Sequence, residues 1–152
     1  MIKLVFKLPV VLVILFALIM IVIDVLGLGY KAEYPWRILL SAVFLIAGFL
    51  ILAIGGYMFR KAKTTVNPMY PERATQLVTS GIFAFSRNPM YIGFLMWLIA
   101  CMIFIGNVIN ILLLPLYIYL ANKLYILPEE KALETIFANE FREYKSKVRR
   151  WL

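Results

Sequence analysis

Long apolar runs separated by short polar segments divide the chain into four predicted membrane-spanning helices. The runs cover residues 8–28, 35–59, 89–105 and 108–127. Gly106 and Asn107 join the last two runs with no charged residue between them, which predicts a helical hairpin. The predicted fold class is therefore an all-α membrane protein, with residues 1–152 forming one integral-membrane domain.

The chain changes character after residue 127, where Pro128, Glu129 and Glu130 place a proline and two acids at a predicted helix start. The predicted C-terminal helix covers residues 128–151, on the cytoplasmic side. Its apolar positions recur every three or four residues and form one stripe opposite a charged face. Such an amphipathic helix either lies on the membrane surface or covers a site as a lid.

Residues 60–88 form a predicted cytoplasmic loop that is too long for a simple turn. Loops of this length in a compact bundle are usually functional. The loop leads into Arg87, Asn88, Pro89, Met90 and Tyr91, just before the apolar hairpin, whereas the paired glutamates come just after it. Because a hairpin crosses the bilayer and returns, the two polar clusters are predicted to meet on one membrane face.

Charge sets the predicted orientation. The chain has 16 Lys and Arg residues and a net charge of +8, and all of these cations except Lys31 and Arg37 fall on one side of a four-span topology. This distribution predicts that both termini are cytoplasmic. The positive charge is thus accounted for by topology and by contact with anionic membrane lipids, and no nucleic-acid partner is predicted.

Several intramembrane residues have structural interpretations. Gly48, Gly55 and Gly56 predict close helix packing, because small residues let transmembrane helices approach each other. Asp24 lies about one turn from a helix end and is interpreted as a hydrated end residue. Pro115 predicts a kink in the fourth helix.

Three segments in order resemble the integral-membrane methyltransferases, a superfamily that includes isoprenylcysteine carboxyl methyltransferase and the phospholipid N-methyltransferases. They are Leu77–Phe83, Ser86–Gly93, and Glu129 and Glu130 followed by Leu133, Phe137, Glu140, Tyr144 and Val148. The resemblance covers roughly residues 60–152, and the chain looks like a small, prokaryote-like member. The signal is specific because all three segments fall on the same predicted membrane face.

The resemblance implies methyl transfer from S-adenosylmethionine, without a metal, to a lipophilic acceptor that enters from the bilayer. By position, it implies cofactor contacts at Thr75, Gln76, Leu77, Val78, Phe83, Asn88, Pro89, Met90, Tyr91 and Glu129. Catalytic roles fall on Arg87 and Glu130. An aromatic ring can pack on adenine or on the sulfonium, a carboxylate can accept from ribose hydroxyls or the ammonium, and Arg87 can pair with a carboxylate.

Two positions depart from the pattern. Asn88 stands where better-known members carry histidine, and the chain has no histidine. Tyr125 aligns with an arginine associated with substrate in the carboxyl methyltransferases. A histidine-free site slightly favours an ionised carboxylate acceptor of the isoprenylcysteine type, since it needs no general base. The alternatives are N- or S-methylation of a phospholipid or other small amphiphile, and a non-catalytic tetraspan adaptor.

Overall fold

The computed structural model describes residues 8–64 and 74–152, and no β-strand occurs in that part of the chain. Its helices are α2 (Pro9–Val25), α3 (Arg37–Lys61), η2 (Gly81–Ala84), α4 (Pro89–Ile105), η3 (Val108–Leu112), α5 (Leu113–Ala121), η4 (Asn122–Ile126) and α6 (Leu127–Lys147). The predicted all-helical class is thus confirmed. The middle of the predicted loop, residues 65–73, and the N-terminal lysines Lys3 and Lys7 lie outside the described residues.

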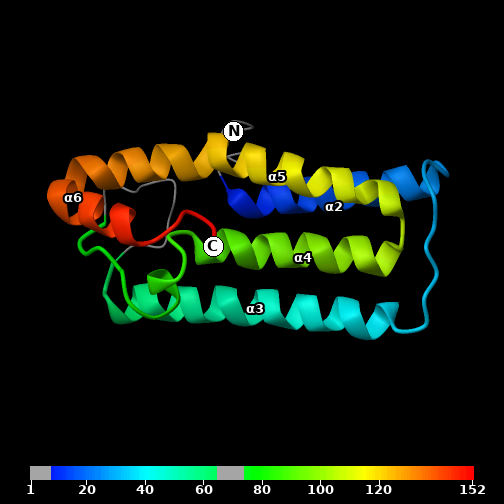
Figure 1. The fold of residues 1–152 in the computed structure, drawn as a ribbon, viewed down its shortest axis with the longest axis horizontal. Helices are drawn as coiled ribbons and strands as arrows, with labels where there is room; N and C mark the ends of the chain where they lie inside the picture. The colour runs from blue at the N-terminus through cyan, green and yellow to red at the C-terminus, as the bar shows by residue number, and fades with distance from the viewer. Residues whose placement is uncertain (1–7, 65–73) are drawn as a thin grey trace.

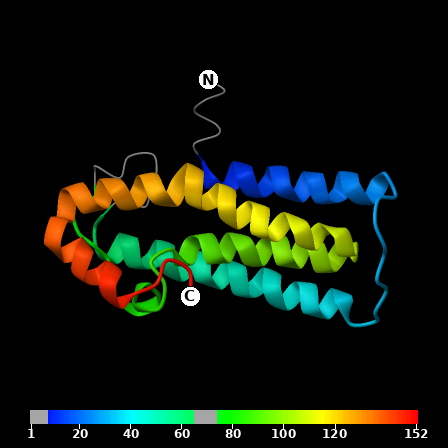
Figure 2. The ribbon, with the colours of Figure 1, turned by 45° about the horizontal axis from the view of Figure 1, so that its top comes forward.

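The helices α2, α3, α4 and α5 lie side by side in an elongated bundle, and each runs antiparallel to the one before it (Figures 1 and 2). Helix α4 lies between α3 on one side and α2 with α5 on the other. The predicted hairpin is therefore present. Two helical runs, α3 and the continuous stretch Val108–Lys147, are long and apolar enough to cross a membrane, and α2 and α4 are shorter apolar helices.

The helix ends follow from local sequence. Pro9 and Pro89 each occupy the first turn of a helix, where the missing N–H breaks no bond. Helix α4 matches its predicted bounds and stops at Gly106, whose φ of 78° is left-handed and closes the last turn. Helix α2 ends at Val25, earlier than predicted, and α3 runs from Arg37 to Lys61, about two residues later than predicted at each end.

Close packing of α3 on α4 is confirmed at two of the three predicted glycines. A Cβ built on Gly48 would lie 2.6 Å from Trp97 Cδ1 and 2.7 Å from the Gly93 carbonyl oxygen. At Gly55 it would lie 3.0 Å from Met90 Cγ. The prediction for Gly56 is wrong, because a Cβ there meets no atom within 4 Å, so this glycine faces away from the partner helix.

The predicted helix with Pro128, Glu129 and Glu130 in its first turn is α6, which begins at Leu127, but no break separates it from α5. A π-helical turn, η4, carries α5 straight into α6, so Pro128 lies inside a helical run of 40 residues. A proline clashes with the carbonyl four residues earlier in a regular α-helix. The wider π turn relieves this clash, because it changes the hydrogen-bond register just before the proline.

The end of α6 differs from the prediction as well. The backbone at Ala138 has φ 40° and ψ −108°, and α6 bends sharply there (Figure 1). The helix ends at Lys147 instead of 151, and Val148 is extended. Residues 148–152, here called the C-terminal strap, fold back toward the start of α4. The predicted apolar stripe therefore does not continue along one straight helix.

The buried core lies among α2, α4 and α5, and Phe16, Met20, Leu98 and Tyr117 are almost completely enclosed. Many large apolar side chains on α2 and α3 face outward, as a lipid solvent requires. At the end of the bundle remote from the strap, Asp24 pairs with Lys31 at 2.9 Å. Asp24 is thus an end residue, as predicted.

Pro115 falls in the first turn of α5, directly after the 3-10 helix η3. In that position its missing N–H costs no α-helical bond. Where the sequence predicts a kink at Pro115, the structure has a change from 3-10 helix to α-helix.

Candidate active site

A cavity of about 260 Å³ lies at the end of the bundle where α4 begins and α6 continues from α5. Its walls come from the first residues of α2, the segment around η2, the start of α4 and both arms of α6. The predicted site residues that line it are Gln76, Leu77, Val78, Phe83, Arg87, Asn88, Pro89, Met90, Tyr91, Glu129 and Glu130. The two polar clusters flanking the hairpin therefore meet at one end of the bundle.

Thr75 is the predicted site residue that does not line the cavity. Its backbone N–H donates to Thr64 Oγ1 at 3.0 Å, and its hydroxyl donates to the Lys63 carbonyl at 3.2 Å. Thr75 thereby ties the chain entering the site to the end of α3. The predicted cofactor contact at Thr75 is not supported by this placement.

Aromatic packing positions the η2 wall of the cavity. The Phe83 ring meets Phe59 of α3 edge to face, with centroids 5.1 Å apart. The buried Tyr144 hydroxyl, from α6, donates to the Phe83 carbonyl at 2.6 Å. Phe83 is 5% exposed, so it presents a fixed apolar surface to whatever occupies the cavity.

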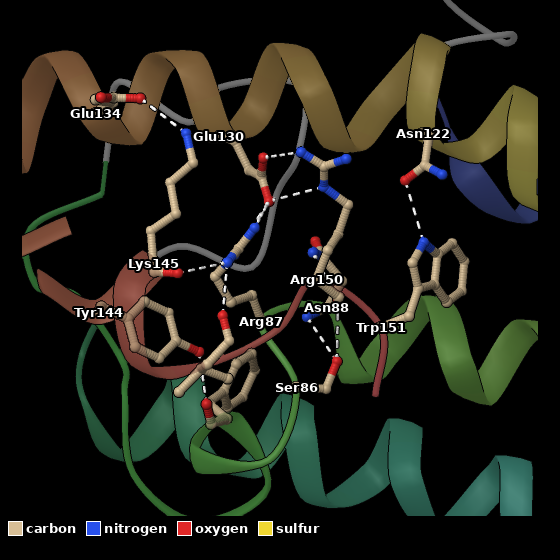
Figure 3. Close-up of polar contacts among 12 residues, drawn as sticks. Ser86, Arg87, Asn88, Asn122, Glu130, Glu134, Tyr144, Lys145, Arg150 and Trp151 are labelled. Atoms are coloured by element: carbon tan, nitrogen blue, oxygen red, sulfur yellow. Dashed lines mark hydrogen bonds and ion pairs between the residues drawn. The ribbon is translucent and has the colours of Figure 1, made fainter. Parts of the chain in front are cut away.

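A buried ion-pair cluster forms one side of the site (Figure 3). Arg87 donates to Glu130 Oε1 through Nε at 3.1 Å and Nη2 at 2.9 Å. Arg150 donates to the same carboxylate through Nε at 3.1 Å and Nη2 at 2.7 Å. The side chains of Arg87 and Glu130 are only 8% and 7% exposed. One buried and one partly exposed cation thus contact the same buried carboxylate.

Arg87 also fastens the strap to the site. Its Nη1 donates to the carbonyls of Lys145 at 3.1 Å and Val148 at 2.6 Å, and its backbone N–H donates to Arg149 at 2.9 Å. Because each nitrogen of the Arg87 guanidinium already has an acceptor, this side chain serves the internal structure. Its predicted catalytic role stays a prediction.

The residues on either side of Arg87 reach the same strap. The Ser86 hydroxyl and Asn88 Nδ2 each donate to the Arg150 carbonyl at 3.2 Å. Further along, Trp151 Nε1 donates to Asn122 Oδ1 at 3.1 Å. The sequence did not predict the strap or its contact with the site. Arg150 was predicted only to be one of the basic residues on the cytoplasmic side.

The paired glutamates have opposite environments. Burial alone would raise the pKa of Glu130, but hydrogen bonds from Arg150 and Arg87 outweigh it and hold that pKa below its ordinary value. Burial raises the pKa of Glu129 to about 7; the Tyr91 hydroxyl lowers it somewhat and the charge of Glu130 raises it further. Two carboxyl groups with separated pKa values are typical of sites in which one group exchanges a proton.

The cavity residues fit a cationic, aromatic-bearing ligand. The Glu129 carboxyl group interacts with the buried Tyr91 hydroxyl. Both residues line the cavity, so both are placed to contact a ligand there. With the fixed ring of Phe83, these groups offer a carboxylate, a hydroxyl and an apolar face in one small volume.

Comparison with known proteins defines the class. Residues 36–140 match the family described as phospholipid methyltransferase, and the chain belongs to this family. The predicted relationship to the membrane methyltransferase superfamily is thereby confirmed, and with its apolar helices the chain is a membrane protein.

Individual relatives agree with this membership. The protein-S-isoprenylcysteine O-methyltransferase of Schizosaccharomyces pombe is 35% identical over 72 residues, which cover 47% of this chain and 30% of that protein. Its namesake from Saccharomyces cerevisiae is 30% identical over 113 residues, covering 68% and 46%. The methanethiol S-methyltransferase of Pseudomonas deceptionensis is 30% identical over 115 residues, covering 74% and 40%. The chain thus spans less than half the length of these relatives. No solved structure matches it.

Proposed function

We propose that this protein is a methyltransferase that uses S-adenosylmethionine and methylates a lipophilic acceptor at the cytoplasmic membrane face. The observation that carries the proposal is the cavity at one end of an apolar bundle, where Asn88–Tyr91 meet Glu129. A cavity in this position is accessible to a polar cofactor from water and to an apolar acceptor from lipid. Membership of the phospholipid methyltransferase family supports the same chemistry.

When bound, S-adenosylmethionine supplies a methyl group on a cationic sulfur. Glu129 is placed to balance positive charge or to accept from ribose hydroxyls, and Phe83 and Tyr91 offer aromatic surfaces for adenine or the sulfonium. Gln76, Leu77 and Val78 line the same cavity. Methyl transfer itself needs alignment of the acceptor atom with the methyl group and exclusion of water from the reacting atoms.

We assign the proposed proton-transfer role to Glu129 and not to Glu130, for which a catalytic role was predicted. Glu130 is held as a carboxylate by two arginines and is a weak base. Glu129 faces the cavity with a pKa of about 7, near the operating pH that suits a general base. For an acceptor that carries a proton on its heteroatom, Glu129 would accept that proton as the heteroatom is methylated.

This assignment changes the balance between acceptors. Carboxyl methylation of an isoprenylcysteine-like molecule is slightly favoured on sequence because the chain has no histidine base. Glu129 removes that reason, so S- or N-methylation of an amphiphilic thiol or amine is the second candidate. The similarity to a methanethiol S-methyltransferase favours the thiol. A non-catalytic adaptor would have no use for a cavity-facing base.

The proposed orientation places the cavity, the strap and both termini in the cytoplasm. Arg60 and Lys61 end α3, and Lys145 and Arg149 lie at the end of α6 and in the strap, whereas Lys31 lies between α2 and α3 and Arg37 begins α3. This asymmetry supports the orientation, because cytoplasmic segments carry an excess of Lys and Arg.

The test is calorimetric titration of S-adenosylhomocysteine into the purified protein in detergent and in lipid. We expect micromolar binding, at least tenfold weaker in Glu129→Gln and unchanged in Glu143→Gln, whose side chain is exposed on α6. Labelled methyl transfer to a prenylcysteine, an alkanethiol and phosphatidylethanolamine then identifies the acceptor. Absence of binding by folded wild-type protein in both media would contradict the proposal and favour the adaptor.

A further inference from the structure

Arg150 lies in the C-terminal strap, after the last helix, and contacts Glu130 in the site. Its side chain crosses from the C-terminal strap to α6 and makes a two-point contact with the Glu130 carboxylate, at 3.1 Å and 2.7 Å. The strap backbone is fixed at the same place, because Ser86 and Asn88 both donate to the Arg150 carbonyl (Figure 3). Both the charge and the position of this arginine are therefore determined by the fold.

The groups that act on Glu129 directly are the Tyr91 hydroxyl from α4 and the Glu130 carboxylate from α6. Arg87 and Tyr144 line the same cavity, and Arg87 and Arg150 both contact Glu130. Among them, Glu130 is the group whose charge opposes ionisation of Glu129. With two arginines on it, Glu130 belongs to a cluster with a net charge of about +1; with Arg87 alone the cluster would be neutral.

We propose that Arg150 is a positioning residue for proton transfer. It holds the Glu130 carboxylate toward the C-terminal strap and away from Glu129, so that Glu129 accepts the proton of the methyl acceptor. The inference rests on the proposed function. Without Arg150, the freed Glu130 carboxylate moves closer to Glu129 and loses half of its compensating charge. Two neighbouring carboxylates with weaker compensation share a proton more readily, so Glu129 ionises at higher pH.

The experiment compares Arg150→Gln, Arg150→Lys and Arg149→Gln in the full chain. Arg149 is the matched control, because it neighbours Arg150 but its side chain is exposed. The readout that needs no cofactor is the infrared C=O stretch of the protonated carboxyl group, assigned with Glu129→Gln and followed with pH. We expect the pH midpoint of Glu129 ionisation to rise by about 0.5 to 1 pH unit in Arg150→Gln. The midpoint should equal that of the wild type in Arg149→Gln and lie between the wild type and Arg150→Gln in Arg150→Lys.

Activity gives the second readout. The rising limb of the pH profile of methyl transfer to an alkanethiol should shift upward with the infrared midpoint in Arg150→Gln. A merely structural role would lower the rate without moving this limb. If wild-type protein transfers no methyl group, the proposed function fails, while the infrared midpoint still decides whether Arg150 controls Glu129.

A further variant covers the case in which Arg150→Gln does not fold. Glu130→Gln removes the opposing charge directly, and we expect it to lower the midpoint of Glu129. An unchanged midpoint in a folded Arg150→Gln protein would overturn the proposal. So would an unchanged midpoint in Glu130→Gln when Arg150→Gln cannot be prepared.

Discussion

Glu129 and Glu130 show how one residue type takes two roles at adjacent positions. Successive side chains on a helix point about 100° apart, so the two carboxyl groups face different surroundings. Glu130 meets two guanidinium groups, whereas Glu129 meets an apolar cavity and a tyrosine hydroxyl. The sequence predicts that both belong to the site, but it does not separate the base from the structural anion, because the separation depends on Arg150.

Replacing Glu129 by Gln should change stability in a pH-dependent way. The folded pKa of about 7 lies above the ordinary value of 4.5, so the folded protein keeps a proton that the unfolded chain loses between these values. Glu129 thus lowers the free energy of unfolding as pH rises from 4.5 to 7, by up to about 3 kcal/mol. We expect Glu129→Gln to raise the Tm relative to wild type at pH 8 and to leave it nearly unchanged at pH 4.5.

Thermal unfolding in detergent at the two pH values measures this difference. Glu140→Gln is the control, because an exposed carboxyl group should shift the Tm little at either pH. Equal effects of Glu129→Gln at pH 4.5 and pH 8 would show that the pKa of Glu129 is ordinary.

Removing Arg87 should be among the most destabilising single changes. Arg87→Gln leaves Glu130 with one cation and removes donors from two carbonyls of the strap region. Loss of one partner of a buried ion pair costs about 3–5 kcal/mol. In the double variant with Glu130→Gln we expect part of this loss to be recovered, and chemical unfolding of the single and double variants measures it. Strictly additive losses would mean that the two side chains do not interact.

The contact between Arg150 and Glu130 could not be predicted from the sequence. Glu130 is 20 positions earlier than Arg150, on the other side of a bend at Ala138. A left-handed backbone at alanine has no sequence signal, since the residues that favour positive φ are glycine and asparagine. By contrast, Arg87 could be placed near Glu130 because a hairpin between two apolar runs brings its ends together whatever its details.

At the scale of elements, the contact between α3 and α4 depends on Gly48. Gly48→Ala puts a Cβ within 3 Å of both the Trp97 ring and the Gly93 backbone, so the helices must separate or shift. Overpacking of this kind costs about 1–3 kcal/mol. We expect a Tm lower by several degrees, measured by thermal unfolding in detergent.

Gly56→Ala is the matched control on the same helix. Its new methyl group meets no atom within 4 Å, and alanine favours helix over glycine by about 1 kcal/mol. The Tm of Gly56→Ala should therefore stay constant or rise. If Gly48→Ala behaved like Gly56→Ala, the close approach of the two helices would be wrong.

The elements themselves were largely predictable, and the failures have specific causes. Apolar runs bounded by Pro9, Pro89 and Gly106 locate helix ends because these residues act on the local backbone. Pro128 marks the start of α6 but does not reveal that α6 continues from α5, because proline is acceptable both in a first helical turn and after a π turn. Glycines in an apolar run likewise do not reveal which of them face the neighbouring helix.

At the scale of the whole molecule, the proposed orientation can be tested by cysteine labelling. In a Cys101→Ser background, single cysteines are introduced by Lys147→Cys at the end of α6 and by Glu33→Cys in the connection between α2 and α3. A membrane-impermeant maleimide should label Glu33→Cys in intact cells and Lys147→Cys only after permeabilisation. The reverse pattern would invert the topology and contradict the positive-inside assignment.

The length of the run Val108–Lys147 has a consequence for how lipid thickness affects the protein. Forty residues at about 1.5 Å each extend to nearly 60 Å of contour, whereas α4, with 17 residues, spans only about 25 Å. A hydrocarbon layer of about 30 Å is thicker than α4 is long, whereas the long run has residues to spare. In a thicker bilayer, Asn88–Tyr91 at the start of α4 should therefore move toward the membrane relative to Glu129 on the longer run. The acyl-chain length of the lipids is thus expected to change the spacing between these two parts of the site.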